Sequence, residues 1–212
     1  MSHDDRLDTY RDRRDFRRTD EPEHGRRQSG KRPIFVIQAH DASHMHYDFR
    51  LEIDGVLKSW AVPKGPSTDP REKRLAVQTE DHPLDYADFE GTIPDDQYGG
   101  GTVQVWDAGW YRNLKTDDNG HVATSMVDAH ADGHLTFQLH GKKLRGGYAL
   151  TRFREERGKA QWLLVKMDDA AADARRNPVS TQTRSVLSGR HLDDIATETR
   201  HNASGTPRKT SS

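Results

Sequence analysis

Residues 46–52, which read His-Tyr-Asp-Phe-Arg-Leu-Glu, alternate strictly between polar and apolar side chains. This period of two is typical of a β-strand, because successive side chains point to opposite faces of the strand. One face carries His46, Asp48 and Arg50, and the other carries aromatic and aliphatic residues. We therefore expect a strand with one solvent-facing side, on which an imidazole, a carboxylate and a guanidinium lie close together.

The rest of the chain repeats this pattern of short strands joined by turns. Asp54-Gly55 is a hairpin signal between two alternating runs, and a second hairpin is expected around Ala108-Gly109. Helical periodicity is almost absent, and further strands are expected at residues 33–37, 56–62, 74–80, 134–139, 147–154 and 161–166. Such a chain favours an antiparallel barrel or sandwich, and closure into a barrel would remove exposed edges. We predict a mainly β protein, a compact antiparallel β-barrel with a short flanking helix and disordered tails.

The polar ends of the chain are expected to lie outside this barrel. Residues 1–32 are predicted to form a charged N-terminal arm, partly helical, whose Tyr10 and Phe16 dock on the protein. Residues 33–168 are predicted to form the barrel domain. Residues 169–212 contain few apolar side chains, and we predict a disordered tail.

The composition limits the classes of function. The 212 residues include 33 basic and 34 acidic ones, so the formal net charge of −1 neither favours nor excludes a nucleic-acid partner. The absence of cysteine excludes disulfides and thiolate metal sites. No apolar run is long enough for a membrane span or a signal peptide, so we expect a cytoplasmic protein with no membrane partner.

The polar face of the strand at 46–52 has the residue types of a metal site. His40 and His44 lie just upstream, where a turn can bring either of them back to His46 and Asp48. Two neutral imidazoles and a carboxylate suit a borderline divalent metal and leave room for a substrate oxygen. Arg50 beside such a metal favours an anionic substrate, because its planar fork fits phosphate or carboxylate. The pattern therefore indicates metal-assisted phosphate chemistry.

Three more side chains are candidates for the same face. Lys64 lies in the rigid turn at residues 63–66. Arg74 and His82 fall at the alternate positions that form the polar face of the next strand and its extension. If the two strands pair in one sheet with their apolar faces in common, Arg74 and His82 converge on the first polar face. We expect all three to contact phosphate.

The glycine run at residues 99–101 has a different interpretation. It lacks the lysine of a phosphate-binding loop and does not connect a strand to a helix. We interpret it as a tight connection or a close approach between backbones.

Seven blocks of sequence occur in the order that they have in a known protein family. They extend over most of the chain, from about Leu7 to Lys166, and together are far more specific than any single motif. The blocks are residues 10–19, 46–52, 55–65, 73–77, 80–86 (Glu-Asp-His-Pro-Leu-Asp-Tyr), 98–103 (Tyr-Gly-Gly-Gly-Thr-Val) and 139–146 (Leu-His-Gly-Lys-Lys-Leu-Arg-Gly). In these blocks the chain resembles the 3′-phosphoesterase domain of bacterial DNA ligase D, which also occurs as a free-standing protein.

The resemblance implies a β-barrel that binds manganese (Mn²⁺) through His40, His46 and Asp48. Cobalt (Co²⁺), zinc (Zn²⁺) and iron stay open, because nitrogen and oxygen ligands alone do not select among them. The implied activity removes a 3′-terminal ribonucleoside from a primer strand and then hydrolyses the remaining 3′-phosphate to a 3′-hydroxyl. The resemblance also implies that the scissile phosphate is surrounded by Arg50, Lys64, Arg74, His82 and Tyr86, with Gln38 and Glu80 close by.

General chemistry gives these residues distinct roles. The arginines and the lysine neutralise charge in the transition state. His82 is expected to donate a proton to the leaving oxygen or to position water, because histidine titrates near neutral pH. Tyr86 is expected to hydrogen-bond a phosphate oxygen, and Glu80 to orient a metal-bound histidine. The expected catalytic residues are therefore His82, Arg50 and Tyr86.

The implied partners are nucleic-acid 3′ ends, above all primer-template DNA with a 3′-ribonucleotide or a 3′-phosphate. The sequence has no ligase nucleophile motif and no room for a polymerase domain, so DNA ligase, polymerase and Ku would act in trans near the nucleoid. The family often has a basic residue and a leucine where this chain has His44 and Met45. Whether His44 replaces His40 as a metal ligand is therefore open at this stage.

Two other classes of protein compete with this interpretation. A catalytically silent nucleic-acid-binding barrel would use the arginines at residues 11–18 and the basic turn at 142–145 on backbone phosphates. A cupin-like metal oxygenase would use His44, His46 and Glu52 as iron ligands. The cationic groups argue against the oxygenase, and the complete set of histidines, aspartate and arginine argues against the silent barrel.

Overall fold

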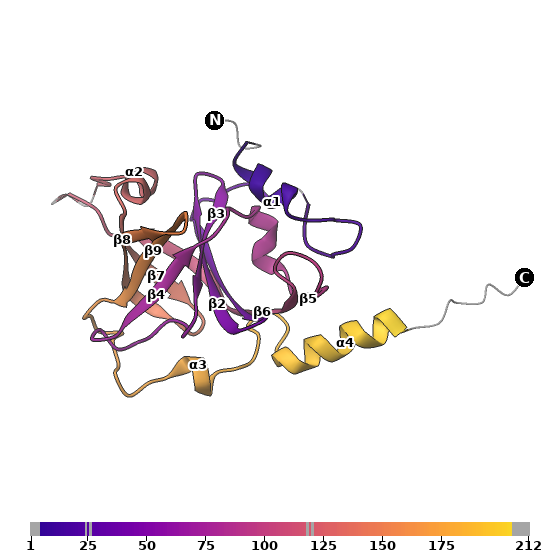
Figure 1. Cartoon of the computed structure of the whole chain (residues 1–212). Coiled ribbons are helices and arrows are strands. Elements are labelled where there is room, and N and C mark those ends of the chain that lie inside the picture. The colour runs from indigo at the N-terminus through magenta and orange to yellow at the C-terminus, as the bar shows by residue number, and fades with distance from the viewer. Residues whose placement is uncertain (1–4, 24, 26, 118, 120, 205–212) are drawn as a thin grey trace, which may run out of the picture.

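The structure is a computed structural model, and it describes residues 5–23, 25, 27–117, 119 and 121–204. Antiparallel strands are its main elements, and eight of them close into a barrel in the order β1-β2-β3-β4-β9-β8-β7-β6, with β6 pairing back to β1 (Figure 1). The mainly β, barrel-shaped fold predicted from the sequence is confirmed. The strands are β1 (Ile34–Asp41), β2 (Met45–Ile53), β3 (Val56–Val62), β4 (Lys73–Gln78), β5 (Gly91–Ile93), β6 (Gly101–Asn113), β7 (His134–Gly141), β8 (Arg145–Glu156) and β9 (Lys159–Lys166).

Short helices lie around the barrel, and the short strand β5 pairs with β6 outside it. No helix in the described part of the chain has the length and the apolar character needed to cross a membrane. The helices are η1 (Asp5–Leu7), α1 (Asp8–Asp12), η2 (Leu84–Asp88), α2 (Met126–Ala131), α3 (Pro178–Thr181) and α4 (Leu192–Ser204).

The apolar face of β2 fills the barrel, as its alternation predicts. Phe49 and Leu51 are fully buried there, together with Trp60, Phe137 and Leu150. These side chains come from β2, β3, β7 and β8, so the core forms only when strands from both halves of the chain come together.

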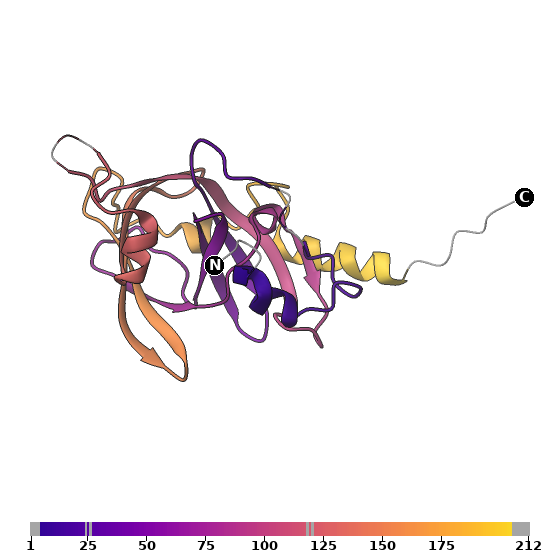
Figure 2. The same ribbon diagram turned by 90° about the horizontal axis from the view of Figure 1, so that it is seen from above.

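A second apolar cluster covers the outer face of β1, β2 and β3. Tyr10 of α1 and Tyr86 of η2 pack there with Leu57, and Figures 1 and 2 show α1 on this side of the barrel. The polar side chains of β2 lie beneath this layer, where Asp48 is 7% exposed and Arg50 2%. The expectation that this face meets solvent is therefore wrong, because segments distant in the sequence cover it.

Strand β6 runs without interruption through Ala108-Gly109, so the hairpin predicted there is wrong. Gly109 pairs with Gly141 of β7, and a Cβ atom on Gly109 would lie 2.2 Å from the carbonyl oxygen of His140. The glycine therefore permits a close approach of two strands and makes no turn.

The segment after β9 lies along the barrel as far as the start of α4. Ile195 is buried, and Nζ of Lys143 donates hydrogen bonds to the carbonyl oxygens of Gln182 and Arg184, each at 2.6 Å. This part of the chain differs from the predicted disordered tail, because a buried lysine between β7 and β8 holds its backbone. Residues 205–212 lie outside the described residues, and the domain boundaries at 32 and 168 stay predictions.

Candidate functional site

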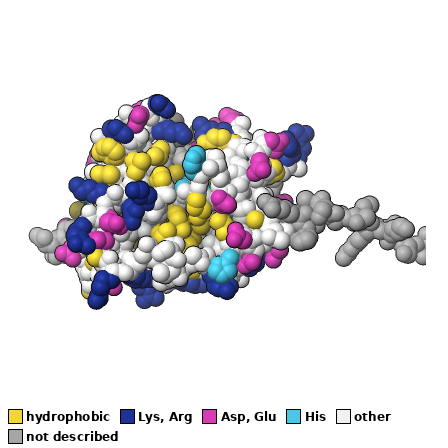
Figure 3. Space-filling model, turned by 60° about the horizontal axis from the view of Figure 1, so that its bottom comes forward, with side chains coloured by type: hydrophobic (Ala, Val, Ile, Leu, Met, Phe, Trp, Pro, Cys, Tyr) yellow, Lys and Arg dark blue, Asp and Glu magenta, His cyan; other side chains and the backbone are white. Residues whose placement is uncertain are grey.

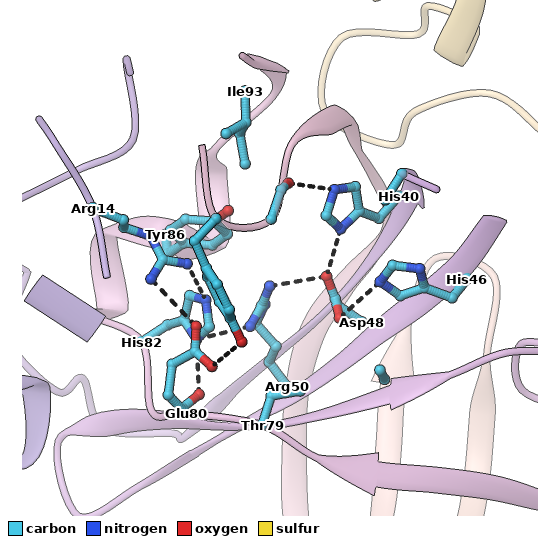
Figure 4. Close-up of a pocket in the computed structure, with 14 residues that line it drawn as sticks. Arg14, His40, His46, Asp48, Arg50, Thr79, Glu80, His82, Tyr86 and Ile93 are labelled. Atoms are coloured by element: carbon cyan, nitrogen blue, oxygen red, sulfur yellow. Dashed lines mark hydrogen bonds and ion pairs between the residues drawn. The ribbon is translucent and has the colours of Figure 1, made fainter. Parts of the chain in front are cut away.

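A cavity of about 140 Å³ lies on the outer face of β1–β3, under the layer formed by the N-terminal segment and η2 (Figure 4). Its walls come from segments that are far apart in the sequence, because barrel closure and the covering layer bring them together. The cavity is lined by Arg14, His40, Ala42, His46, Asp48, Arg50, Ala61, Thr79, Glu80, His82, Tyr86, Ile93, Tyr98 and Gly99.

Two histidines and an aspartate form a compact group at one end of this cavity. His40 of β1 pairs directly with His46 of β2, so their side chains share one face of the sheet, and Asp48 lies two residues further along that face. Nδ1 of His40 is 3.3 Å from Oδ2 of Asp48, and Nε2 of His46 is 3.6 Å from Oδ1. One ligand atom from each residue lies within 4.8 Å of the other two, so the group could hold a metal ion.

Backbone carbonyl groups orient both imidazole rings. Nε2 of His40 lies 3.0 Å from the carbonyl oxygen of Gly99, and Nδ1 of His46 lies 2.9 Å from that of His44. Because a carbonyl oxygen only accepts, these are the nitrogens that carry the proton in the tautomers suited to metal binding. The lone pairs of the opposite nitrogens then point toward Asp48, as metal-binding histidines require.

Asp48 is held in its ionised form. Burial would raise the pKa of this carboxyl group, but the charge of Arg50, whose Nη2 lies 3.2 Å from Oδ2, and the adjoining imidazoles of His40 and His46 hold the pKa well below its usual range. A carboxylate and two imidazoles are donors that Mn²⁺, Co²⁺ and Zn²⁺ accept, and three donors leave positions open for substrate or water. The residues present fit a divalent metal without selecting one.

The structure brings His40, not His44, to the group. The side chain of His44 is exposed, and the residue contributes its carbonyl oxygen to the ring of His46. The alternative that His44 takes the place of His40 therefore does not fit this geometry.

Arg50 is fixed beside the group by several hydrogen bonds. Its Nε donates to Gln38 Oε1 at 2.8 Å, and its Nη1 donates to Ser59 Oγ at 2.8 Å. Gln38 in turn donates to the carbonyl oxygen of Tyr86 at 3.0 Å, and the guanidinium of Arg50 lies 4.8 Å from the Tyr86 ring centroid. Gln38 therefore acts behind the cavity wall, where it holds Arg50 in place.

His82 lies between two guanidinium groups. Its Nδ1 is 3.0 Å from Nη1 of Arg50, and its Nε2 is 3.3 Å from Nη2 of Arg14. Burial, followed by the charges of Arg50 and Arg14, holds the pKa of His82 well below its usual range. The imidazole is therefore neutral at neutral pH, and an anion bound beside the two guanidinium groups would favour its protonation.

The sequence analysis missed Arg14, which enters the cavity from the segment after α1. Its side chain is 4% exposed, and it forms ion pairs with Glu21 at 2.9 Å and with Glu80 at 3.2 Å. The hydroxyl group of Tyr86 also donates to Glu21, at 3.0 Å. The run of charges around Arg14 is typical of a solvated arm, so its only signal was its place in the first block of the resemblance.

Glu80 and Tyr86 line the cavity, but their hydrogen bonds differ from those expected. Glu80 pairs with Arg13 and Arg14, whereas backbone carbonyl groups orient the histidines. Burial, followed by the charge of Glu21, raises the pKa of Tyr86 well above its usual range, so its hydroxyl group keeps its proton. Both residues belong to the network that fixes the two arginines.

Lys64 and Arg74 do not line this cavity. They lie together in a separate one of about 350 Å³, where Arg74 forms an ion pair with Glu72 at 2.5 Å. Arg74 lies on the same face of β4 as Ala76, which is fully buried in the barrel core, whereas Leu75 on the other face is 39% exposed. The expectation that Arg74 converges with His82 is therefore wrong, because β4 turns the opposite face inward.

The fold and this site define a class of protein, a closed β-barrel that can hold a divalent metal and an anion on its outer face. The sequence of residues 38–152 matches the family described as the DNA ligase D 3′-phosphoesterase domain. The chain belongs to this family.

Curated relatives agree with this assignment. The chain is 47% identical over 196 residues to the multifunctional non-homologous end joining protein LigD of Pseudomonas aeruginosa. The aligned region covers 88% of this chain and 22% of that protein. It is 44% identical over 165 residues to the LigD DNA repair protein of Mycobacterium tuberculosis, covering 77% of this chain and 20% of that protein. It is 43% identical over 166 residues to LigD of Mycolicibacterium smegmatis, and the aligned region covers 78% of this chain and 21% of that protein. The chain spans about a fifth of the length of these relatives.

Proposed function

We propose that this chain is a metal-dependent hydrolase that repairs DNA 3′ ends. It removes a 3′-terminal ribonucleoside and then the 3′-phosphate, leaving a 3′-hydroxyl. The observation that carries the proposal is the position of Arg50, which is buried and 3.2 Å from Asp48 of the histidine-aspartate group. A fixed cation beside the proposed metal ligands supports a phosphate as the group acted on.

Both proposed steps are hydrolyses at phosphorus. In the first step water bonds to phosphorus, the bond to O5′ of the terminal nucleoside breaks, and the nucleoside leaves with a proton on O5′. In the second step water again bonds to phosphorus, the bond to O3′ breaks, and the strand keeps a 3′-hydroxyl while inorganic phosphate leaves.

The proposed metal is Mn²⁺ held by His40, His46 and Asp48, and Co²⁺ or Zn²⁺ fit the same donors. When bound, the metal supplies Lewis-acid chemistry at a phosphate oxygen. Arg50 and Arg14 donate to the other oxygens, and loss of such a donor typically costs about 10² to 10³ in rate.

His82 is proposed to act on the leaving group or on water. In the free site its neutral ring is a hydrogen-bond partner, and phosphate charge beside Arg14 and Arg50 raises its pKa so that it can deliver a proton. Tyr86 positions Arg50 and Glu21 in this scheme. To donate to a phosphate oxygen, its hydroxyl group would have to give up the hydrogen bond that it donates to Glu21. Lys64 and Arg74 line a separate cavity, so this scheme gives them no contact with the scissile phosphate.

The proposed partners are nucleic-acid 3′ ends, with DNA ligase, polymerase and Ku acting in trans. The relatives are named for non-homologous end joining, which supports a place in double-strand break repair. We propose that the protein works in the cytoplasm at the nucleoid.

The structure does not assemble the ligand set of the oxygenase alternative. Glu52 accepts a hydrogen bond from the backbone N–H of Ile34 at 2.8 Å, and the side chain of His44 is exposed. The silent binding barrel remains the second candidate, because basic residues lie in the turn at 142–145.

The test uses a 5′-labelled primer-template that ends in a 3′-phosphate or in one ribonucleotide. Metal-dependent conversion to a 3′-hydroxyl by the wild type, lost in His82→Ala and Asp48→Ala, is expected. His44→Ala is the matched control and is expected to retain activity. If the wild type binds the strand but converts neither end with Mn²⁺, Co²⁺ or Zn²⁺, the protein is a binding module.

A further inference from the structure

A second cavity of about 330 Å³ opens beside the catalytic one. It lies between the end of β4 and the β8–β9 hairpin, and Thr79, Glu80 and Tyr98 line both cavities. The two cavities therefore adjoin at these three residues, and the histidine-aspartate group lies in the first of them. The second cavity is lined by Thr9, Arg13, Gln78, Thr79, Glu80, Tyr98, Glu155, Gly158, Lys159 and Ala160.

Tyr98 stands at the junction as a fixed but exposed aromatic ring. The residue is 43% exposed, yet its hydroxyl oxygen lies 2.7 Å from Nη1 of Arg13 and 3.4 Å from Glu80. The guanidinium of Arg13 lies 4.7 Å from the ring centroid. A flat aromatic ring and a guanidinium plane, both held in place, form a surface on which a nucleobase stacks.

The junction is close to the position proposed for the scissile phosphate. Gly99, the residue after Tyr98, accepts the hydrogen bond of His40 through its carbonyl oxygen. The ring of Tyr98 is therefore tied by one peptide unit to the histidine-aspartate group. Tyr98 also lines the cavity that contains the histidine-aspartate group, so a nucleoside attached to a phosphate in that cavity can reach its ring.

The polar groups of the second cavity favour a neutral, hydroxyl-bearing ligand. Glu155 and Glu80 are hydrogen-bond acceptors that would repel a phosphate, and Lys159 and Arg13 partly balance them. A ribonucleoside has hydroxyl donors for the carboxylates and a base for the aromatic surface, whereas a strand that ends in a 3′-phosphate has no group to place there.

We infer that this second cavity is the subsite for the terminal ribonucleoside that is removed in the first step, with its base stacked on Tyr98 and Arg13. The inference rests on the proposed function. Tyr98 is then a specificity-determining residue. Its ring contacts the leaving nucleoside of the 3′-ribonucleoside end, whereas the 3′-phosphate end has no group that reaches the ring.

The test compares kcat/KM for two ends on the same primer-template, a 3′-ribonucleoside and a 3′-phosphate. In Tyr98→Ala we expect kcat/KM for the ribonucleoside end, divided by kcat/KM for the phosphate end, to fall about ten-fold. A loss of this size is within the range for one stacked base. Tyr98→Trp is expected to keep the wild-type ratio. Tyr98→Phe also keeps it, because the ring stays while the hydroxyl bonds to Arg13 and Glu80 are lost.

An unchanged ratio in Tyr98→Ala would overturn the inference, and so would an equal shift in Tyr98→Phe, because a positioning role through Glu80 would then explain both. A direct readout is the binding of adenosine to the metal-free protein, followed by NMR, which Tyr98→Ala is expected to weaken about ten-fold. If the wild type converts neither end, the proposed function itself fails, and that outcome differs from a changed ratio.

Discussion

Nε of Arg14 donates to Oε1 of Glu21 at 2.9 Å, and neither side chain is more than 4% exposed. Both residues belong to the N-terminal segment, which contacts the rest of the protein through the ion pair of Arg14 with Glu80 and the hydrogen bond from Tyr86 to Glu21. In this position Arg14 reaches His82. The cavity that contains the histidine-aspartate group is therefore completed by a segment that lies outside the barrel itself.

Glu21→Gln is expected to lower both stability and activity. The change removes a charged acceptor from Arg14 and Tyr86, and loss of a hydrogen bond to a buried charge costs about 1.5–3 kcal/mol. Activity is expected to fall about 10- to 100-fold, as for other residues that orient a site. Urea unfolding and the primer-template assay measure the two effects. Asp96→Asn, which breaks an exposed pair with Arg18, is the control, and equal effects of both changes would contradict the argument.

Metal binding is expected to stabilise the wild type. A ligand at 100 times its Kd adds about 2.7 kcal/mol to the free energy of unfolding, so Mn²⁺ should raise Tm measured by circular dichroism. His40→Ala, His46→Ala and Asp48→Asn should lose this rise. His44→Ala should keep it, and loss of the rise in this variant alone would show that the ligand assignment is wrong.

His130 should make stability depend on pH. Burial, with the charges of Lys58 and Arg152, lowers its pKa to about 4, whereas the unfolded chain has the ordinary value of about 6.5. Between these values unfolding takes up a proton, so the free energy of unfolding should fall as the pH falls from about 6.5 to about 4. Unfolding in urea at pH 7 and pH 5 should show a smaller difference in His130→Gln than in the wild type. If the free energy of unfolding changed equally between pH 7 and pH 5 in both proteins, a group other than His130 would cause the pH dependence.

Gly109→Ala is expected to destabilise the barrel by about 1–3 kcal/mol, because its Cβ would lie 2.2 Å from the carbonyl oxygen of His140. Gly30→Ala is the matched control, since the nearest atom to its added Cβ is 3.9 Å away. Thermal unfolding compares the two variants. A neutral Gly109→Ala would mean that the two strands can separate at little cost.

The strands and the metal group could be predicted because both depend on local pattern. Alternation at 46–52 predicts one strand and its faces, and the register of a hairpin then places His40 against His46. The glycine run at 99–101 predicts a tight connection or a close approach between backbones. A Cβ on Gly101 would lie 2.2 Å from the carbonyl oxygen of Asp41, which confirms a close approach between backbones.

The remaining features depend on partners that lie far away in the sequence. The inward face of β4 is set by its neighbours in the barrel, so alternation alone could not tell that Arg74 and Ala76 point one way and Leu75 the other. Gly109 has the signature of a turn until β7 is known to pass beside it. Arg14 is one arginine among several, and only its burial against Glu21 and Glu80 distinguishes it.

The ligands of the histidine-aspartate group all lie on one hairpin, β1–β2, whereas the groups proposed to hold phosphate come from the N-terminal segment, β2 and the region before η2. The two halves of the site can therefore be lost separately. Cleavage of the chain between Glu21 and β1, or failure of the N-terminal segment to dock, would leave a molecule that still takes up metal. Such a molecule would be metal-loaded but inert toward DNA ends, so metal content alone is a poor measure of the active fraction in any preparation.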